Sequence, residues 1–362
     1  MRPSPSRDPQ KKKRQHTVQE SCEPSIITPR EVVRCLDRHI YGQEHAKETI
    51  GMICQNIQHR YFFPEIGIPK TNCLIMGPTG TGKTEMLKTL SSYINIPFAT
   101  LPMTALSPVG YKGGTIDSVF YQLIPDLLSE MTMSEIKALS KEELKAHSYE
   151  LIDHAIIYLD EIDKIHEHGN TAGFDEGLQD ELIGLIEDSP VFGGALSTRD
   201  MTFIGTGVFS GLEEIVYRRM TGKGNIGFDK RQAAEGMKEN PFAYVTTKDL
   251  VEYGMKPELI PRFTQRSYTT SLSVDNLSQI LDLKTSVLSR NRKLLKRAYD
   301  ISLRVTKEAK RAIAQYASET DANARGLNTT VDTMLRDIML DPESYRGKTI
   351  TLTGKNIIYR LN

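Results

Sequence analysis

The sequence predicts an α/β domain built on a five-stranded parallel sheet, followed by a small, mainly helical C-terminal domain. The first observation is a set of short apolar runs without strict alternation, which is typical of strands buried on both faces of a parallel sheet. These runs are residues 73–76, 98–101, 155–159 and 202–204. Helix-spaced segments lie between them, as in the alternating pattern of α/β domains. A last strand is expected at 267–272, and after it the composition shifts toward helix formers.

The chain has 362 residues, which is more than one hydrophobic core usually serves, so we expect two folded domains and a tail. The expected division is a flexible basic tail at 1–27, a large domain at 28–265 and a small domain at 266–362. The tail is rich in Pro, Ser and charge, and residues 11–14 read KKKR. Such a segment lacks the apolar surface needed to order alone. A solvated tail is the simplest interpretation, and contact with nucleic acid or a targeting role is the alternative.

The first helix is expected to begin at Thr28, because Thr28 and Glu31 form the pattern of a capping box and Pro29 suits the first helical position. A second helical stretch carries Ile50, Ile53 and Ile57 along one side. In the C-terminal domain, helical spacing recurs around residues 277–288, 309–316 and 327–338, and strand-like pieces follow at 349–352 and 357–361.

The composition excludes some classes of protein but indicates no particular binding partner. The chain is 39% hydrophobic and 25% charged, and 46 basic residues balance 46 acidic ones. Its four cysteines contain no CxxC pair, which argues against a zinc site or a disulfide framework. No window approaches the roughly 18 apolar residues of a membrane span. We therefore expect a cytoplasmic protein without a membrane partner.

Residues 77–84 match the phosphate-binding loop G-x-x-x-x-G-K-S/T after a predicted strand and before a helix start. Glycines let successive backbone N–H groups turn toward phosphate oxygens, and the helix N-terminus favours the anion. Lys83 is expected to reach the β- and γ-phosphates, and Thr84 to bind Mg²⁺. The predicted nucleotide-binding residues are Gly77, Pro78, Thr79, Gly80, Thr81, Gly82, Lys83 and Thr84. ATP and Mg²⁺ are the expected cofactors.

A second predicted strand ends in Asp160 and Glu161, two adjacent carboxylates that are costly there unless a cation neutralises them. Asp160 is expected to hold Mg²⁺, directly or through water. Glu161 is one residue further out, where it can orient and deprotonate the attacking water. With the phosphate-binding loop, these residues predict ATP hydrolysis.

Three segments resemble the ClpX family of AAA+ unfoldases: residues 159–165 (LDEIDKI), 40–47 (IYGQEHAK) and 323–327 (NARGL). The resemblance runs from about Thr28 to near the C-terminus and implies a P-loop NTPase fold of the AAA+ type. By position, it implies that Ile40 and Tyr41 line the adenine pocket, although a hydrophobic pair that ends a helix is an equal alternative.

The resemblance also implies three further residues around the nucleotide. Thr206 matches the sensor-1 position, with a capping threonine as the alternative. Arg262 matches the arginine finger that one subunit supplies to its neighbour, where a guanidinium stabilises charge on the transferring phosphoryl group. Arg325 matches the sensor-2 arginine of the small domain. A finger that acts on a neighbour implies a ring, and the family implies a homohexamer.

Two loops bear on what the hydrolysis drives. Gly110, Tyr111, Lys112 and Gly113 resemble the family's aromatic pore loop, which would grip protein substrates, although Lys112 replaces the usual apolar residue. An ordinary turn with an exposed Tyr is the alternative. Ile226, Gly227 and Phe228 match the loop that docks into a Clp-type peptidase, with an internal hydrophobic anchor as the alternative. His166 and His168 are assigned to a pore-facing loop rather than to a metal site.

Two departures from the family pattern put substrate selection in doubt. The family's N-terminal zinc domain is not expected here, and residues 189–200 lack the basic Arg-Lys-His loop used to select tagged substrates. The leading hypothesis is an ATP-driven unfoldase that delivers proteins to a Clp-type peptidase. A stand-alone remodeller of protein complexes is the alternative. A nucleic-acid motor is disfavoured, because the basic tail is the only feature that supports it.

Overall fold

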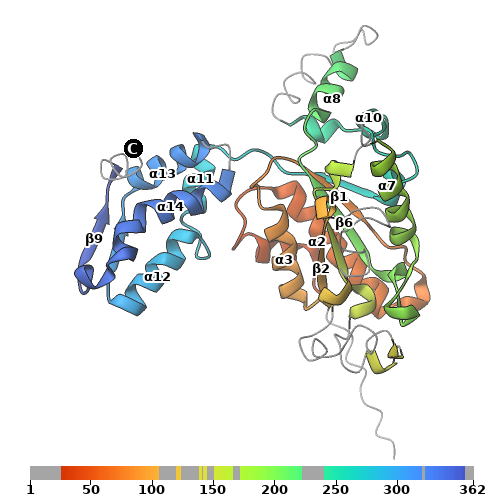
Figure 1. Ribbon diagram of the computed structural model, residues 1–362, viewed down its shortest axis with the longest axis horizontal. Helices are drawn as coiled ribbons and strands as arrows, with labels where there is room; N and C mark the ends of the chain where they lie inside the picture. The colour runs from red at the N-terminus through yellow and green to blue at the C-terminus, as the bar shows by residue number, and fades with distance from the viewer. Residues whose placement is uncertain are drawn as a thin grey trace, which may run out of the picture.

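A computed structural model describes residues 26–105, 120–123, 138–140, 142–144, 151–165, 172–221, 240–319 and 323–354. The described chain forms two units, joined by the segment that leaves strand β7 (Figure 1). The large unit comprises the described residues up to Tyr268, and the small unit those from Leu272 onward. In Figure 1 the small unit lies to the left of the large unit.

The large unit is built on a five-stranded sheet with the strand order β2-β3-β6-β1-β7. Every neighbouring pair in this sheet is parallel. The strands are β1 (Cys73–Met76), β2 (Phe98–Pro102), β3 (Ile156–Asp160), β6 (Thr202–Gly207) and β7 (Gln265–Tyr268). The predicted α/β fold with a five-stranded parallel core is confirmed.

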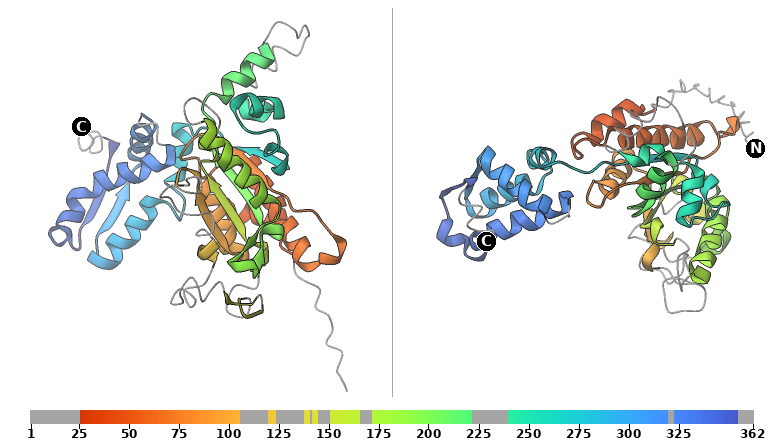
Figure 2. Two further views of the ribbon diagram at one scale, coloured as in Figure 1. Left: turned by 45° about the vertical axis from the view of Figure 1, so that its right-hand side comes forward. Right: turned by 90° about the horizontal axis from the view of Figure 1, so that it is seen from above.

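Helices cover both faces of this sheet, and each face has its own buried core. The helices of the large unit are α1 (Pro29–Leu36), α2 (Glu44–Phe62), α3 (Lys83–Ile94), α7 (Ala172–Glu187), α8 (Leu212–Thr221) and α10 (Thr247–Tyr253). Residues of α1, α2 and α3 pack on one face with Ile75, Tyr158 and Ile204. Residues of α7 pack on the other face with Leu159 and Phe203. Figure 2 shows the sheet between these two layers.

The N-terminal helices begin as local chemistry predicts. Thr28 and Glu31 form the expected capping box at the start of α1, with Pro29 in the first turn. Gln43 precedes α2 in the left-handed region at φ 64°. Its side-chain amide exchanges two hydrogen bonds with the backbone of Thr270, at 2.9 and 2.8 Å. Gln43 thereby fixes the segment that connects the two units.

The small unit packs helices on a short parallel strand pair. Its elements are α11 (Val274–Ile280), α12 (Val287–Tyr299), β8 (Ser302–Val305), α13 (Lys307–Glu319), α14 (Asn323–Leu340) and β9 (Thr349–Leu352). Leu277, Leu295, Ile313 and Leu335 belong to its buried core. The helical character of this unit and the strand at 349–352 agree with prediction, whereas strand β8 was not predicted. The strand-like piece at 357–361 lies outside the described residues.

The last strand of the sheet begins earlier than the strand expected at 267–272. Strand β7 begins at Gln265 and ends at Tyr268, so the sheet continues beyond residue 265. This strand lies at the sheet edge, and among the described strands it pairs with β1 alone. Its first three residues, Gln265, Arg266 and Ser267, are polar, so no apolar pattern marks where it begins. A two-stranded antiparallel pair, β4 (Pro190–Val191) with β5 (Leu196–Ser197), follows α7.

Within the described ranges, no helix is both long and apolar enough to span a membrane. Cys35, Cys54 and Cys73 are free thiols, and Cys54 and Cys73 are buried. Burial raises the pKa of both of these thiols, to about 12 for Cys54. They are therefore inert core residues rather than nucleophiles.

Candidate nucleotide-binding site

The phosphate-binding loop lies where prediction placed it, between the end of β1 and the start of α3. Its glycines adopt positive φ, at 145° for Gly77, 75° for Gly80 and 95° for Gly82, a region that side chains other than hydrogen rarely enter. Gly77 also lies against the connecting segment. A Cβ atom at Gly77 would lie 2.3 Å from Thr269 Oγ1 and 2.5 Å from Thr269 O. The phosphate-binding loop thus packs against the segment that connects β7 to the small unit.

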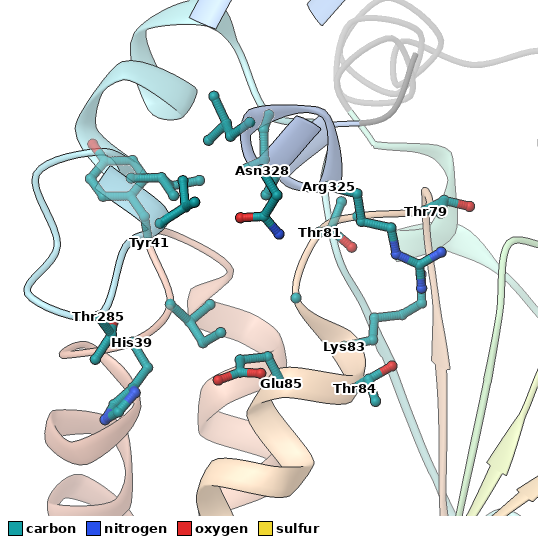
Figure 3. A pocket seen from close by; sticks show the side chains of 18 of the residues that line it. His39, Tyr41, Thr79, Thr81, Lys83, Thr84, Glu85, Thr285, Arg325 and Asn328 are labelled. Carbon is teal, nitrogen blue, oxygen red and sulfur yellow. The ribbon is translucent and has the colours of Figure 1, made fainter. Parts of the chain in front are cut away.

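Lys83 folds back over this loop. Its ammonium donates to Gly77 O at 2.6 Å and to Pro78 O at 2.8 Å. Burial lowers the pKa of Lys83 to about 8, with a further lowering by the cation of Arg325, while Asp163 and Asp160 oppose both. Figure 3 shows Arg325 and Lys83 extending toward the same region from opposite sides. Two cations that converge on one cavity favour a polyanionic ligand.

The N-terminus of α14 brings Arg325 to this position by contacting the loop directly. Asn323 Nδ2 donates to Thr79 O at 2.9 Å, and the Ala324 amide donates to Gly80 O at 3.2 Å. Asn323 Oδ1 also accepts from the Leu272 amide at 3.3 Å, where the small unit begins. These bonds tie the small unit to the phosphate-binding loop.

A cavity of about 370 Å³ lies between the two units, and residues Thr79 to Thr84 of the phosphate-binding loop line it. This volume is within the range of about 300–1,000 Å³ that is common for small-molecule sites. Ile40 and Tyr41 line the cavity from the large unit, and Leu281 and Leu327 line it from the small unit. Tyr41 lies at the end remote from Lys83 in Figure 3. The apolar end suits a flat base and the cationic end suits phosphates.

The carboxylate end of β3 lies at the same cavity. Asp160, Glu161 and Thr206 all line it. Thr206 is fully buried, whereas Glu161 is exposed and holds a φ of 57°. Left-handed backbone at a residue other than glycine or asparagine is strained, and such strain concentrates at functional sites. The structure therefore brings together the predicted sensor threonine and both predicted carboxylates.

Tyr158 connects these groups, and sequence reasoning missed its role. Its hydroxyl donates to Asp160 Oδ1 at 2.6 Å and lies 2.8 Å from Thr84 Oγ1 and 2.9 Å from Thr206 Oγ1. Burial raises the pKa of Tyr158 above its ordinary value, and the hydrogen bond to Asp160 adds to this effect. The available signal was a tyrosine two residues before Asp160, which places both side chains on one face of the strand.

The donors at this end fit Mg²⁺. Thr84 Oγ1 and Asp160 Oδ1 are oxygen atoms that both lie within hydrogen-bond distance of the Tyr158 hydroxyl, and hard divalent cations prefer oxygen. Magnesium at nucleotide sites commonly takes one or two protein ligands and completes its shell with phosphate oxygens and water. The described residues contain no group of three or more His, Cys, Asp or Glu that would hold a metal by themselves.

Arg262 does not line this cavity. It closes the short 3-10 turn Ile260–Arg262, and its carbonyl accepts from Asn72 Nδ2 at 2.9 Å. Its guanidinium pairs with Glu187 at the end of α7. Arg262 is thus separate from the cavity of this chain.

Several predicted features lie outside the described residues. These are Gly110, Tyr111, Lys112 and Gly113 of the expected pore loop, Ile226, Gly227 and Phe228 of the expected docking loop, His166, His168, and the basic run at 11–14.

Comparison with known proteins identifies relatives of both units. A model of the AAA domain (Cdc48 subfamily) matches residues 68–266, more than half of the chain, and a model of the C-terminal, D2-small domain of ClpB protein matches residues 272–348. The ATP-dependent Clp protease ATP-binding subunit ClpX of Borrelia duttonii is 29% identical over 357 residues, which cover 92% of this chain and 79% of that protein. Its counterpart in Treponema denticola is 29% identical over 358 residues, with 92% and 82% covered.

Proposed function

This chain belongs to the AAA domain family as a Clp/HSP100-type AAA+ ATPase, and we propose that it works as an ATP-driven protein unfoldase. The observation that carries the proposal is the convergence of Lys83 and Arg325 from different units on one cavity. A triphosphate in this cavity would contact both units at once. Binding and hydrolysis would then change the angle between the units, as in hinge motions around ligands.

The roles of the site residues follow from their positions. Lys83 and the amides of the phosphate-binding loop would hold the β- and γ-phosphates, while Thr84 and Asp160 would hold Mg²⁺. When bound, Mg²⁺ neutralises charge that develops on the phosphoryl oxygens. Glu161 would take a proton from the attacking water, because it is exposed to the cavity and one residue beyond Asp160. Thr206 would orient that water, and Arg325 would respond to the γ-phosphate.

A ring of six identical subunits completes the site in this proposal. Arg262 is remote from the cavity of its own subunit, so it would reach the nucleotide of a neighbour. Tyr111 and its flanking glycines would move a polypeptide through the central channel. Ile226 to Phe228 would dock a Clp-type peptidase, in line with the ClpX relatives, which are named as ATP-binding subunits of the Clp protease.

Glu161→Gln tests the hydrolytic part. The amide cannot accept the proton of water, so hydrolysis should fall at least about 100-fold while ATP still binds. Single-turnover hydrolysis and equilibrium nucleotide binding measure the two steps. Near-normal turnover in the variant would exclude Glu161 as the base.

The protein substrate and the peptidase need separate experiments. Tyr111→Ala should stop the unfolding of a folded fluorescent reporter and leave ATP hydrolysis in place. Deletion of residues 226–228 should abolish degradation by an added Clp-type peptidase and spare both hydrolysis and unfolding. If degradation persists in the deletion variant, docking through these residues is wrong, and if no peptidase supports degradation by the wild type, a stand-alone remodeller is the better description.

A further inference from the structure

Tyr158 occupies a buried position between the two predicted Mg²⁺ ligands. It lies in the middle of β3, and its side chain is fully buried. Residues two apart in a strand share a face, so Tyr158 and Asp160 point the same way. Ile204 and Thr206 of β6 lie opposite them in register. The phenol therefore reaches the junction of β3, β6 and the start of α3.

Three oxygens surround the Tyr158 hydroxyl within hydrogen-bond distance. They are Asp160 Oδ1 at 2.6 Å, Thr84 Oγ1 at 2.8 Å and Thr206 Oγ1 at 2.9 Å. Thr206 Oγ1 also lies 3.3 Å from Asp160 Oδ1. A phenol has only one proton to donate, so Tyr158 is the donor in only one of these three contacts.

The chemistry of the carboxylate fixes the direction of each bond. Ionised Asp160 can only accept, so Tyr158 gives it the single phenolic proton. The Thr84 hydroxyl must then donate its own proton to the Tyr158 oxygen. This orientation leaves the lone pairs of Thr84 Oγ1 directed away from the phenol, where they are available to a cation.

We propose that Tyr158 is a positioning residue that holds the Thr84 hydroxyl in the orientation needed to bind the Mg²⁺ of MgATP. The Asp160 carboxylate fixes the direction of the Tyr158 O–H bond, and the Tyr158 oxygen in turn fixes the direction of the Thr84 O–H bond. This inference rests on the proposed function of the site as a Mg-nucleotide site. It adds a residue through which the ends of β3, β6 and α3 act on the same metal ion.

A purely structural role for Tyr158 makes a different prediction. The ring packs against Phe98 with centroids 5.9 Å apart, and phenylalanine would retain this packing. If the hydroxyl served stability alone, its loss would weaken nucleotide binding equally with and without Mg²⁺. If it orients Thr84, only the Mg²⁺-dependent part of binding changes.

The test compares wild type with Tyr158→Phe in the full chain. Binding of a fluorescent ADP analogue is measured in Mg²⁺ and in EDTA, and Mn²⁺ binding to the protein–ADP complex is followed by electron paramagnetic resonance. Loss of a residue that orients a metal ligand typically weakens metal affinity about 10–100-fold. We expect a loss of this size for Mg²⁺-dependent nucleotide binding and for Mn²⁺, and no change in EDTA. Tyr93→Phe removes the hydroxyl of an exposed tyrosine on α3 and is the matched control.

A double-mutant cycle with Thr84→Ala shows whether Tyr158 acts through Thr84. Because the proposed action passes through the Thr84 hydroxyl, Tyr158→Phe should cause no further loss of Mn²⁺ affinity once Thr84 is alanine. Additive losses, or equal losses with and without metal, would overturn the role of Tyr158. Failure of the wild type to bind nucleotide more tightly in Mg²⁺ would instead overturn the proposed function. A thermal melt of each variant verifies that it folds.

Discussion

The guanidinium of Arg262 forms an ion pair with the carboxylate of Glu187 inside a single subunit. The two side chains are 41% and 46% exposed. Ion pairs with this exposure are typically worth about 0–1 kcal/mol, because water screens the attraction. The pair therefore holds Arg262 in a defined place without preventing it from leaving, and in the proposed ring a triphosphate bound to a neighbouring subunit would be a stronger partner.

Arg262→Ala should reduce ATP hydrolysis about 10³-fold or more, the usual contribution of an arginine finger, and leave ATP affinity within about twofold. If the finger acts on a neighbour, as proposed, mixtures of Arg262→Ala with Lys83→Ala subunits should recover part of the activity. Steady-state ATPase assays across mixing ratios measure this recovery. Arg199→Ala removes another exposed arginine paired with an acidic side chain, Asp188, and should have little effect. Mixtures no more active than either variant alone would argue against action between subunits.

Glu187→Gln should raise ATP hydrolysis, because it removes the competitor for Arg262. An exposed pair worth at most about 1 kcal/mol limits the gain to about fivefold. The gain should disappear in the Glu187→Gln/Arg262→Ala double variant, since no finger remains to be released. ATPase rates at protein concentrations that saturate assembly measure the effect. A fall in rate with Glu187→Gln would mean that the ion pair supports the active arrangement instead.

The phosphate-binding loop, the carboxylates and the parallel sheet were predictable because their signals are local. Residues 77–84 match a motif whose spacing is fixed by backbone geometry around a phosphate. The strands β1, β3 and β6 are fully buried over most of their length, and the short apolar runs at 73–76, 155–159 and 202–204 mark them in the sequence. The capping box at Thr28 is equally local. In each case the structure could be predicted from residues that are close together in the sequence.

The features that the sequence did not reveal depend on contacts between distant segments. Tyr158 meets Thr84 across 74 positions, and Asn323 meets Thr79 across 244. Strand β7 begins with the polar residues Gln265, Arg266 and Ser267, so its first residues carry no apolar signal and its start was placed two residues too late. Hydrogen bonds of this kind leave no periodic trace in the sequence.

Gly77→Ala should destabilise the large unit by about 3–5 kcal/mol. The substitution adds the strain of a φ of 145° to a clash of the new Cβ with Thr269, since both Thr269 Oγ1 and Thr269 O would lie within 2.5 Å. Gly67→Ala separates the two effects. Gly67 has a φ of 68° and nothing within 4 Å of a Cβ, so strain alone should cost about 1–2 kcal/mol. Urea unfolding followed by circular dichroism measures both variants, and equal losses would show that the contact with Thr269 is unimportant.

Lys70 provides a test of pH dependence away from the nucleotide site. Its ammonium donates to Thr198 O at 3.0 Å and to Glu187 O at 3.3 Å, and it lies 5.4 Å from the centroid of the Phe203 ring. Burial, with the nearby cation of Arg60, lowers the pKa of Lys70 from an ordinary value of 10.5 to about 8. Between these two pH values the folded chain has released this proton while the unfolded chain retains it.

Unfolding in that window takes up a proton, so the contribution of Lys70 to the free energy of unfolding must rise with pH from about 8 to 10.5. A full shift of this size would be worth about 3 kcal/mol, and solvent screening of the partly exposed amine reduces our expectation to about 1–2 kcal/mol. The free energy of unfolding of wild type minus that of Lys70→Met should increase by this amount, as measured by urea denaturation from pH 7.5 to 10.5. Lys88→Met removes an exposed lysine on α3 and controls for the change in net charge. A difference between wild type and Lys70→Met that stays constant over this range would show that the amine keeps its proton in the folded chain.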